Sequence, residues 1–285
     1  MKLKPSIQTM QRLKTRFDQD RYRSALRIAV DGVLAVETTV ARLSDVGRAP
    51  LPRVPDGAAT ALVKTFDRPR EVQRLVKSLH RTHPGLEIIV VDDSRTRPDV
   101  PDATLLSMPF NSGISAGRNA GLAEITTPYF LLLDDDHICY RHTRIADAIA
   151  TMEAHPEIDI LGGQVLNFPD LRVHDYSHAG LFPHERDFLH EPGTLVGGLP
   201  VVPKAPNFFL GRTEAVRSLG WSDDLKVLEH RDFFTRAVGV LTTVQDSSFR
   251  ILHARNPFNR ASDERRENGA LARAELRRRY FQSST

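Results

Sequence analysis

The sequence has almost no cysteine, no long apolar run and no strong excess of either charge. Its 285 residues include one cysteine, Cys139, which excludes an internal disulfide framework and fits a reducing compartment. The formal net charge of +3 is small for this length. It does not by itself indicate a nucleic-acid partner, which would require a basic patch with interleaved aromatic residues. No stretch approaches the roughly 18–20 apolar residues of a membrane-spanning helix.

The N-terminal region contains no recognisable targeting signal. Its most apolar stretch, ALRIAVDGVLAV, includes Arg27 and Asp31 and lacks the cleavage pattern of a secretory signal peptide. Together with the lone cysteine, this predicts a cytoplasmic protein.

Both ends of the chain are rich in basic residues. The C-terminal segment ALARAELRRRYFQ places Leu271, Leu276 and Tyr280 among four arginines. Such dense like charge usually marks a solvated helix face. The alternative is attraction to anionic lipid, at about 1 kcal/mol per basic residue near the surface. Weak peripheral contact with the inner face of a membrane is therefore an additional prediction.

After a proline-rich break at residues 46–57, strand-like apolar runs alternate with helical patterns. Strands are predicted at 59–66, 86–94, 103–110, 129–136 and 159–167, and helices at 69–83, 115–125 and 143–155. This alternation predicts a parallel sheet covered by helices. Residues 168–200 are expected to form long loops or a hairpin. The remaining expected elements are a strand and helix in 206–221, a helix in 228–239, two short strands in 242–255 and a terminal helix over 261–281.

Two acidic clusters follow strands of this predicted sheet. Asp92 and Asp93 end one strand, and Asp134, Asp135 and Asp136 end another. In open parallel sheets, ligands bind beyond the carboxyl ends of the strands, where the strand order reverses. Three adjacent carboxylates repel one another there, and a divalent cation with a preference for oxygen ligands would remove the repulsion. Because side chains alternate along a strand, the first and third of the triplet should share the site face, and the second should point away.

Four segments in this order resemble the family 2 glycosyltransferases and the wider group of nucleotide-sugar transferases with the GT-A fold. They are KTFDRP (64–69), IIVVDDS (88–94), NSGISAGRNAGL (111–122) and FLLLDDD (130–136). The resemblance implies an α/β protein of GT-A type, with a mostly parallel Rossmann-like sheet flanked by helices. An N-terminal helical extension and a C-terminal acceptor-side region would complete it. Galactosyl- and N-acetylgalactosaminyltransferases are the members that this sequence is most similar to.

The resemblance also implies a nucleotide-sugar donor, with a UDP-sugar favoured. The residues that it assigns to the donor are Thr65, Asp67, Arg68, Asp92, Asp93, Gly113, Arg118, Asp134 and Asp135. The implied metal, Mn²⁺ or Mg²⁺, would be held by Asp136 and Asp134, with His253 completing the site. Structural alternatives exist for several of them, such as a helix cap for Asp67 and a surface position for Arg118.

The segment GWSDDLKVLEHRDFFTR (220–236) resembles the acceptor-side element of the same group. Inversion at an anomeric carbon needs a base that deprotonates the acceptor hydroxyl. Glu229, His230 and Asp232 are the candidates, and the sequence leaves open which of them takes the proton. Asp232 shares a helix face with Glu229 and could instead orient or bind the acceptor. Trp221 could stack on the acceptor sugar, and core packing is an equal alternative.

These features predict four regions and one main function. The regions are an N-terminal helical extension with its linker (1–57), a nucleotide-sugar-binding half (58–167), an acceptor-binding and catalytic half (168–260) and a basic C-terminal helix (261–285). The predicted function is metal-dependent, inverting sugar transfer to a glycan or lipid-linked glycan in surface polysaccharide synthesis, without a nucleic-acid partner. One alternative is a nucleotidyltransferase that makes nucleotide sugars, although KTFDRPRE lacks its usual glycine-rich loop. The other is a catalytically inactive glycan-binding protein with the same fold.

Overall fold

The computed structural model describes residues 25–26, 28–34, 39, 49–168, 171–173, 180–254, 256 and 261–282. Most of the predicted N-terminal helical extension and its linker (1–57) lies outside these ranges. Residues 28–34 are helical. Val30 and Leu34 of this segment pack against Ile138, Leu166 and Leu252 in a small buried cluster.

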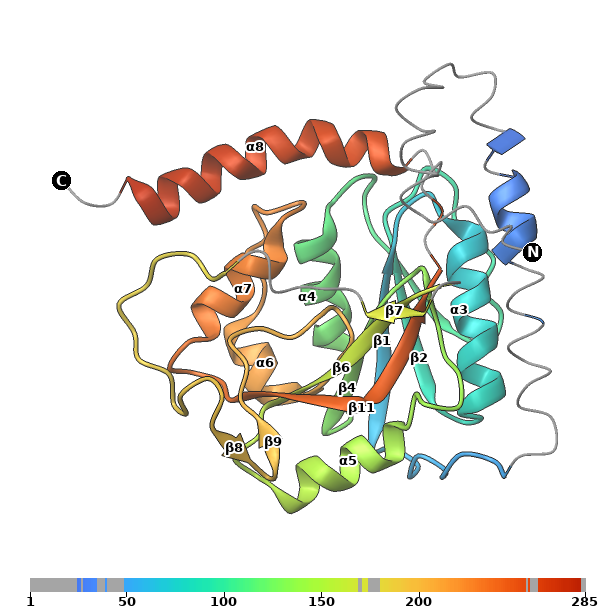
Figure 1. Cartoon of the computed structure of the whole chain (residues 1–285). Helices are drawn as coiled ribbons and strands as arrows, with labels where there is room; N and C mark the ends of the chain where they lie inside the picture. The colour runs from blue at the N-terminus through green and yellow to red at the C-terminus, as the bar shows by residue number, and fades with distance from the viewer. Residues whose placement is uncertain are drawn as a thin grey trace, which may run out of the picture.

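In the described residues, nine strands form one sheet (Figure 1). These strands are β1 (Ala59–Thr65), β2 (Glu87–Asp92), β3 (Thr104–Ser107), β4 (Tyr129–Asp134), β5 (His137–Ile138), β6 (Ile160–Asn167), β7 (Arg172–Val173), β10 (Phe209–Arg212) and β11 (Thr243–His253). The order is β3-β2-β1-β4-β10-β6-β11-β5, with β7 paired to β6. Strands β1 to β4 run parallel, and β10 is antiparallel to both of its neighbours. A separate hairpin pairs β8 (Leu195–Val196) with β9 (Leu199–Pro200).

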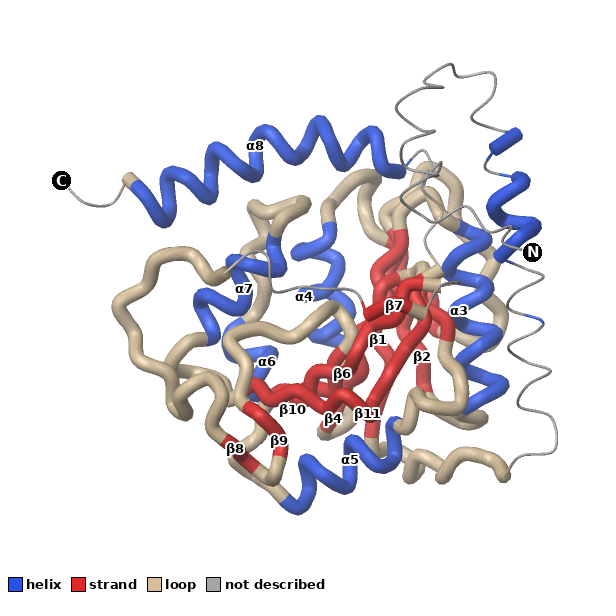
Figure 2. Tube along the Cα trace, viewed as in Figure 1, coloured by secondary structure: helices blue, strands red, loops and turns tan. Residues whose placement is uncertain are grey.

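Helices cover both faces of this sheet (Figure 2). They are α3 (Pro69–Thr82), α4 (Ile114–Glu124), α5 (Ile145–Ala154), α6 (Thr213–Leu219) and α7 (Glu229–Ala237), whereas α8 (Ala261–Phe281) lies across one end of the molecule. Side chains alternate along β1. Ala61 and Val63 therefore pack in the core formed with α3 and α5, whereas Leu62 packs in the core formed with α4, α6 and α7. The sheet is buried on both faces, as the apolar runs of the sequence predict.

The predicted order of strands and helices is confirmed, and two details are corrected. The expectation of two short strands in 242–255 is wrong, because β11 is one strand of 11 residues. Its pairing with β6 shifts register between Gln245 and Arg250, so a bulge interrupts the pattern without ending the strand. Strand β4 ends at Asp134, and Asp135 and Asp136 lie in a turn.

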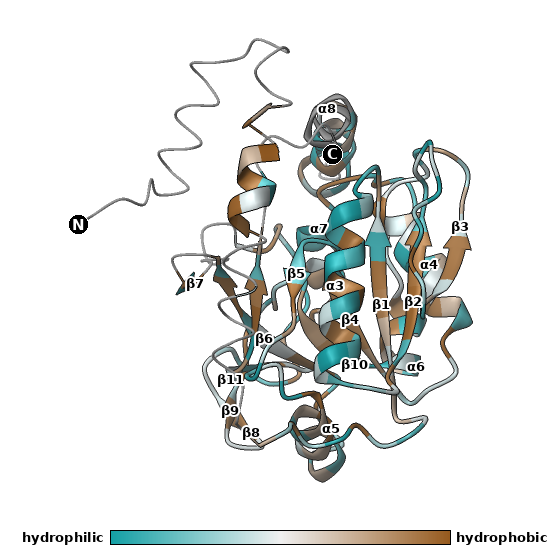
Figure 3. Cartoon of the chain, turned by 90° about the vertical axis from the view of Figure 1, so that its right-hand side faces the viewer, coloured by the Kyte–Doolittle hydropathy of each residue, from teal (hydrophilic) through white to brown (hydrophobic). Residues whose placement is uncertain are grey.

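The order in which strands are added to the sheet reverses at β1. Strand β2 pairs with one edge of β1 and β4 pairs with the other, both in parallel. The carboxyl ends of β1 and β4 therefore flank the kind of crevice in which α/β proteins bind ligands. In Figure 3 the arrowheads of β1, β2 and β3 are directed toward the end of the molecule where α8 lies. Within the described residues, no helix has both the length and the apolar character that crossing a bilayer requires.

Candidate active site

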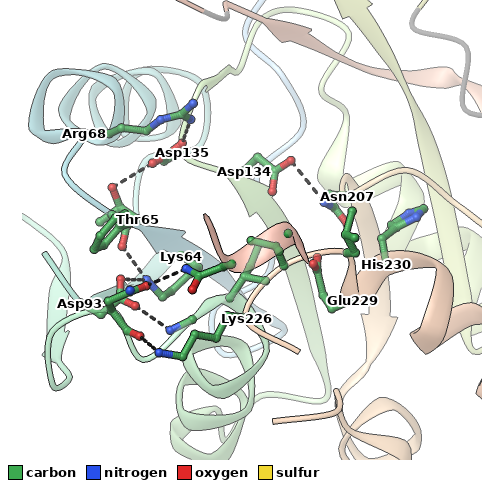
Figure 4. Close-up of a pocket in the computed structure, with 18 of the residues that line it drawn as sticks. Lys64, Thr65, Arg68, Asp93, Asp134, Asp135, Asn207, Lys226, Glu229 and His230 are labelled. Atoms are coloured by element: carbon green, nitrogen blue, oxygen red, sulfur yellow. Dashed lines mark hydrogen bonds and ion pairs between the residues drawn. The ribbon is translucent and has the colours of Figure 1, made fainter. Parts of the chain in front are cut away.

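A pocket of about 520 Å³ lies at the carboxyl ends of β1 and β4 (Figure 4). The predicted site residues that line it are Thr65, Arg68, Asp93, Gly113, Asp134, Asp135, Asp136, Glu229, His230 and His253. These residues come from segments as far apart as β1 and the end of β11. The remaining predicted residues, which do not line the pocket, are Asp67, Asp92, Arg118, Trp221 and Asp232.

The acidic triplet is held by one buried arginine. The guanidinium of Arg68 donates to Asp135 at 2.6 Å and to Asp136 at 3.0 Å. The Thr65 hydroxyl also donates to Asp135, at 2.9 Å. Burial opposes the charge of Arg68, yet Asp135 and Asp136 together raise its pKa. The expectation that Asp135 points away from the site is wrong, because the strand alternation stops at Asp134 and the turn brings Asp135 into the pocket.

Asp134, Asp136 and His137 form a cluster that could hold a metal ion, since their ligand atoms all lie within 4.8 Å of one another. The imidazole of His253 is 3.4 Å from the Asp136 carboxylate. Burial works against the charge of Asp136, but His253 and Arg68 hold its pKa well below its usual range. Carboxylate and imidazole donors together suit Mn²⁺ better than Mg²⁺, which prefers oxygen ligands alone.

His137 was missed at the level of sequence, although it follows the acidic triplet directly. Its Nδ1 accepts a hydrogen bond from the Asp134 backbone N–H at 3.2 Å, which orients the ring. Asn207 was missed as well. Its side-chain amide donates to Asp134 at 3.4 Å from the segment just before β10, and it lines the pocket.

The opposite end of the pocket is organised around Asp93. Its carboxylate forms an ion pair with the buried Lys64 amine and accepts a hydrogen bond from the Gly113 N–H at 2.9 Å. Burial lowers the pKa of Lys64, although Asp93 opposes this effect. A Cβ on Gly117 would lie 2.3 Å from Cδ of Lys64, so the glycine leaves the room that the lysine needs. Lys64 was present in the quoted motif but was not predicted as a site residue.

Asp67 and Asp92 stabilise a loop beside the pocket. Asp67 accepts hydrogen bonds from the backbone N–H and the guanidinium of Arg95, at 3.1 and 3.0 Å. The Asp92 carboxylate accepts hydrogen bonds from the backbone N–H and the hydroxyl of Ser94. Burial raises the pKa of Asp92. Both carboxylates therefore hold the loop that follows β2.

Arg118 is buried behind the pocket, with 1% of its surface exposed. Its guanidinium donates to Glu229 at 2.7 Å and to Asp134 at 3.3 Å. The same group lies 5.6 Å from the centre of the Trp221 ring. The alternative of a surface cation is therefore wrong. Arg118 joins the first turn of α7 to the end of β4.

The three candidates for the catalytic base have different surroundings. Glu229 is buried and lines the pocket at the start of α7. The Nε2 atom of His230 is 2.6 Å from the carbonyl oxygen of Ala205, and burial lowers the pKa of this imidazole. Asp232 is fully buried and accepts hydrogen bonds from Ser222, Arg236, Arg279 and Tyr280. Burial opposes its charge, but the hydrogen bonds from Ser222, Tyr280 and Arg236 lower the pKa of Asp232.

Trp221 lies in the core. Its ring stacks on Phe233 with the centroids 4.9 Å apart and an interplanar angle of 21°, and 5% of the residue is exposed. Of the two alternatives for this residue, the structure supports core packing.

Residues 60–220 match the family model described as glycosyl transferase family 2. The chain belongs to this family. The chain is also similar to β-1,4 N-acetylgalactosaminyltransferase 2 of Mus musculus, 31% identical over 186 residues, which span 64% of this chain and 36% of the mouse protein. β-1,4 N-acetylgalactosaminyltransferase 1 of Homo sapiens is 32% identical over 209 residues, which span 68% of this chain and 38% of the human protein. The predicted similarity to N-acetylgalactosaminyltransferases is confirmed. The chain spans less than two fifths of the length of these relatives.

Solved structures confirm the fold. The crystal structure of S. aureus TarS 1–349 superposes with a TM-score of 0.52 at 16% identity, over 77% of this chain and 65% of that one. The architecture is therefore the GT-A type that the resemblance predicts. The family match ends at residue 220, before α7 and α8, so those two helices lie outside it.

Proposed function

We propose that this chain is a metal-dependent inverting glycosyltransferase that moves a hexosyl or N-acetylhexosaminyl group from a nucleotide sugar to a glycan acceptor. Family membership and the named relatives support sugar transfer. The observation that carries the proposal is the position of Arg118. It binds Glu229 and Asp134 at once, so a candidate base and a candidate metal ligand lie on one pocket wall.

The base in this proposal is Glu229. Arg118 holds Oε1 of Glu229, which leaves the second carboxylate oxygen to take the proton of the acceptor hydroxyl. That hydroxyl attacks the anomeric carbon of the donor sugar, and the bond to the diphosphate breaks with inversion. Asp232, with four donors around it and no surface in the pocket, stabilises α7 in this scheme.

Asp134, Asp136 and His137 would hold the metal ion, with His253 next to Asp136. A divalent ion bound there would supply the positive charge that neutralises the departing diphosphate. Arg68 fixes the two neighbouring carboxylates so that the ligand oxygens keep their positions.

In this proposal, two regions of the chain bind the two substrates. Residues 58–167 supply Lys64, Asp93 and Gly113, which surround the end of the pocket that we assign to the nucleotide, with a uridine diphosphate favoured. Residues 168–260 supply Asn207, Glu229 and His230 toward the acceptor. A glycan or lipid-linked glycan of a surface polysaccharide is the proposed acceptor class. Weak contact with anionic lipid stays a prediction, for which liposome sedimentation at low and high salt is the measurement.

A donor screen tests the proposal. The purified chain is incubated with UDP-, GDP- and dTDP-sugars and simple saccharide acceptors, with Mn²⁺ or with EDTA. We expect sugar transfer, or slow donor hydrolysis, from one nucleotide class only, and only with the metal. Pyrophosphate release from a nucleoside triphosphate and a sugar 1-phosphate would instead identify a nucleotidyltransferase. Glycan binding without any turnover would identify an inactive family member.

A further inference from the structure

Helix α8 forms part of the pocket although it lies outside the family match. Asn268, Gly269 and Arg273 of this helix line the cavity. The side-chain amide of Asn268 donates to the side-chain oxygen of Asn111 at 3.3 Å, on the loop that follows β3. Figures 1 and 3 both show α8 lying across the end of the molecule toward which the parallel strands point.

Specific contacts dock this helix on the rest of the chain. Leu276 is 5% exposed and packs with Leu225 and Phe182. The Tyr280 ring stacks on Phe182 with the centroids 4.4 Å apart. Tyr280 and Arg279 both donate to Asp232, each at 2.8 Å. Two of the three apolar residues that the sequence places among the C-terminal arginines, Leu276 and Tyr280, therefore pack against other parts of the protein. Leu271 remains 75% exposed.

The cations of the pocket fall into two groups. Lys64 and Arg68 are paired with Asp93, Asp135 and Asp136. Lys226 and Arg273 have no carboxylate partner within the described residues. The amine of Lys226 donates to the backbone carbonyl of Asn111 at 2.7 Å. Arg273 is exposed to solvent and extends this positive region from α8.

Resting on the proposed function, we infer that Arg273 binds the diphosphate of the donor, together with Lys226. A nucleoside diphosphate brings negative charge, and these two cations are the ones not already neutralised by carboxylates in the described part of the pocket wall. A guanidinium can donate two parallel hydrogen bonds to a phosphate, which an ammonium cannot do. Docking of α8 through Asp232 thus positions a donor-binding residue, and Arg273 gives the pocket its preference for a diphosphate over a nucleoside alone.

The test compares Arg273→Ala with Arg277→Ala. Arg277 is exposed on the same helix, one turn later, and does not line the pocket. Binding of UDP and of uridine is measured by calorimetry, each with Mn²⁺ and with EDTA, and melting temperatures check the fold. We expect Arg273→Ala to weaken UDP binding about 10-fold or more while uridine binding stays unchanged, because hydrogen bonds between charged groups are the strong ones. Arg277→Ala should match the wild type, and Arg273→Lys should keep part of the affinity.

The experiment distinguishes a failure of the inference from a failure of the proposed function. If the wild type binds UDP and Arg273→Ala binds it equally well, the inference is wrong and the proposed function stands. A parallel loss of uridine binding would also overturn it, because Arg273 would then act only through the structure of α8. If the wild type binds none of UDP, GDP and dTDP, the proposed function fails and the inference fails with it. Should GDP or dTDP bind in place of UDP, the same comparison with its own nucleoside decides.

Discussion

The guanidinium of Arg118 lies 2.7 Å from the carboxylate of Glu229, although 111 positions separate the two residues in the chain. Both are buried, and the same guanidinium reaches Asp134 at 3.3 Å. One cation on α4 therefore sets the distance between the start of α7 and the end of β4. The sugar-transfer proposal depends on this arrangement, because the base must deprotonate the acceptor hydroxyl beside the donor whose diphosphate the metal ion would neutralise.

Replacing Arg118 should damage both stability and turnover. Arg118→Ala leaves the buried Glu229 without its opposite charge, and breaking a buried ion pair from one side costs about 3–5 kcal/mol in the free energy of unfolding. Turnover should fall by ~10²-fold or more, since both carboxylates lose their orientation. Denaturant unfolding and steady-state kinetics measure the two effects. Arg118→Lys is the matched control and should recover part of the stability. A stable, fully active Arg118→Ala protein would contradict the positioning role.

The choice of base can be decided by two conservative variants. Glu229→Gln keeps the shape of the side chain and a partner for Arg118 but cannot accept the proton, so kcat should fall ~10²–10⁴-fold. The affinity for the nucleoside diphosphate should hardly change. His230→Asn should cost less, because burial lowers the pKa of His230 and Nε2 already contacts the Ala205 carbonyl. If His230→Asn abolishes turnover and Glu229→Gln does not, the histidine is the base.

His137 should contribute directly to metal affinity. Its ring lies with Asp134 and Asp136 in the candidate metal cluster. His137→Ala should weaken Mn²⁺ binding by at least ~10-fold, as the loss of a group that orients or ligates a metal does. Calorimetric titration with Mn²⁺ in the absence of substrate is the measurement. His184→Ala, at an exposed position in a loop, is the control and should bind the metal like the wild type. Equal affinities for all three proteins would exclude His137 from the site.

Stability should depend on pH through a histidine far from the pocket. His83 is 3% exposed, its Nε2 is 2.7 Å from the Thr143 carbonyl, and burial lowers its pKa to about 4. The unfolded chain binds a proton at this residue below pH 6.5, whereas the folded chain does so only near pH 4. The stabilisation is thus fully present above pH 6.5 and is lost as the pH falls toward 4, by up to about 3 kcal/mol.

Urea unfolding at pH 7, 6, 5 and 4 measures this slope. His83→Gln should flatten the dependence between pH 6.5 and 4, even if its overall stability is lower. His80→Gln, on the same helix α3, should keep the wild-type slope. An unchanged slope in His83→Gln would show that other groups cause the acid sensitivity.

Much of the fold could be predicted from the sequence because its signals are local. The apolar run from Tyr129 to Leu133 gives β4, and the terminal helix predicted over 261–281 has those bounds in the structure. The two predictions that were wrong, for β11 and for Asp135, also have physical causes. A bulge leaves β11 intact, and the turn after Asp134 overrides the alternation from which the position of Asp135 was predicted.

The carboxylates of the candidate site could be predicted from the sequence. The side chains from distant segments that pair with them could not. Acidic residues at strand ends fall at one sheet edge whenever the strands are parallel, so Asp93 and Asp134 could be placed together. Helical periodicity cannot tell which face of α7 is buried by α8, and Asp232 therefore appeared as an acceptor-side carboxylate. Tyr280 and Arg279 bind it in the structure. The pairing of Arg118 with Glu229 likewise depends on how distant elements pack.

The most direct test of the account is a Mn²⁺ titration of turnover for the wild type and Asp136→Asn, with the donor identified by the screen. Asp136 is buried, lies in the metal cluster, and has His253 and Arg68 as neighbours. We predict that wild-type turnover is absent in EDTA and rises to saturation with Mn²⁺. Asp136→Asn should stay inactive at every Mn²⁺ concentration, with a melting transition that shows it is folded. Near-full activity of Asp136→Asn, or wild-type turnover that persists in EDTA, would contradict metal-dependent transfer at this site.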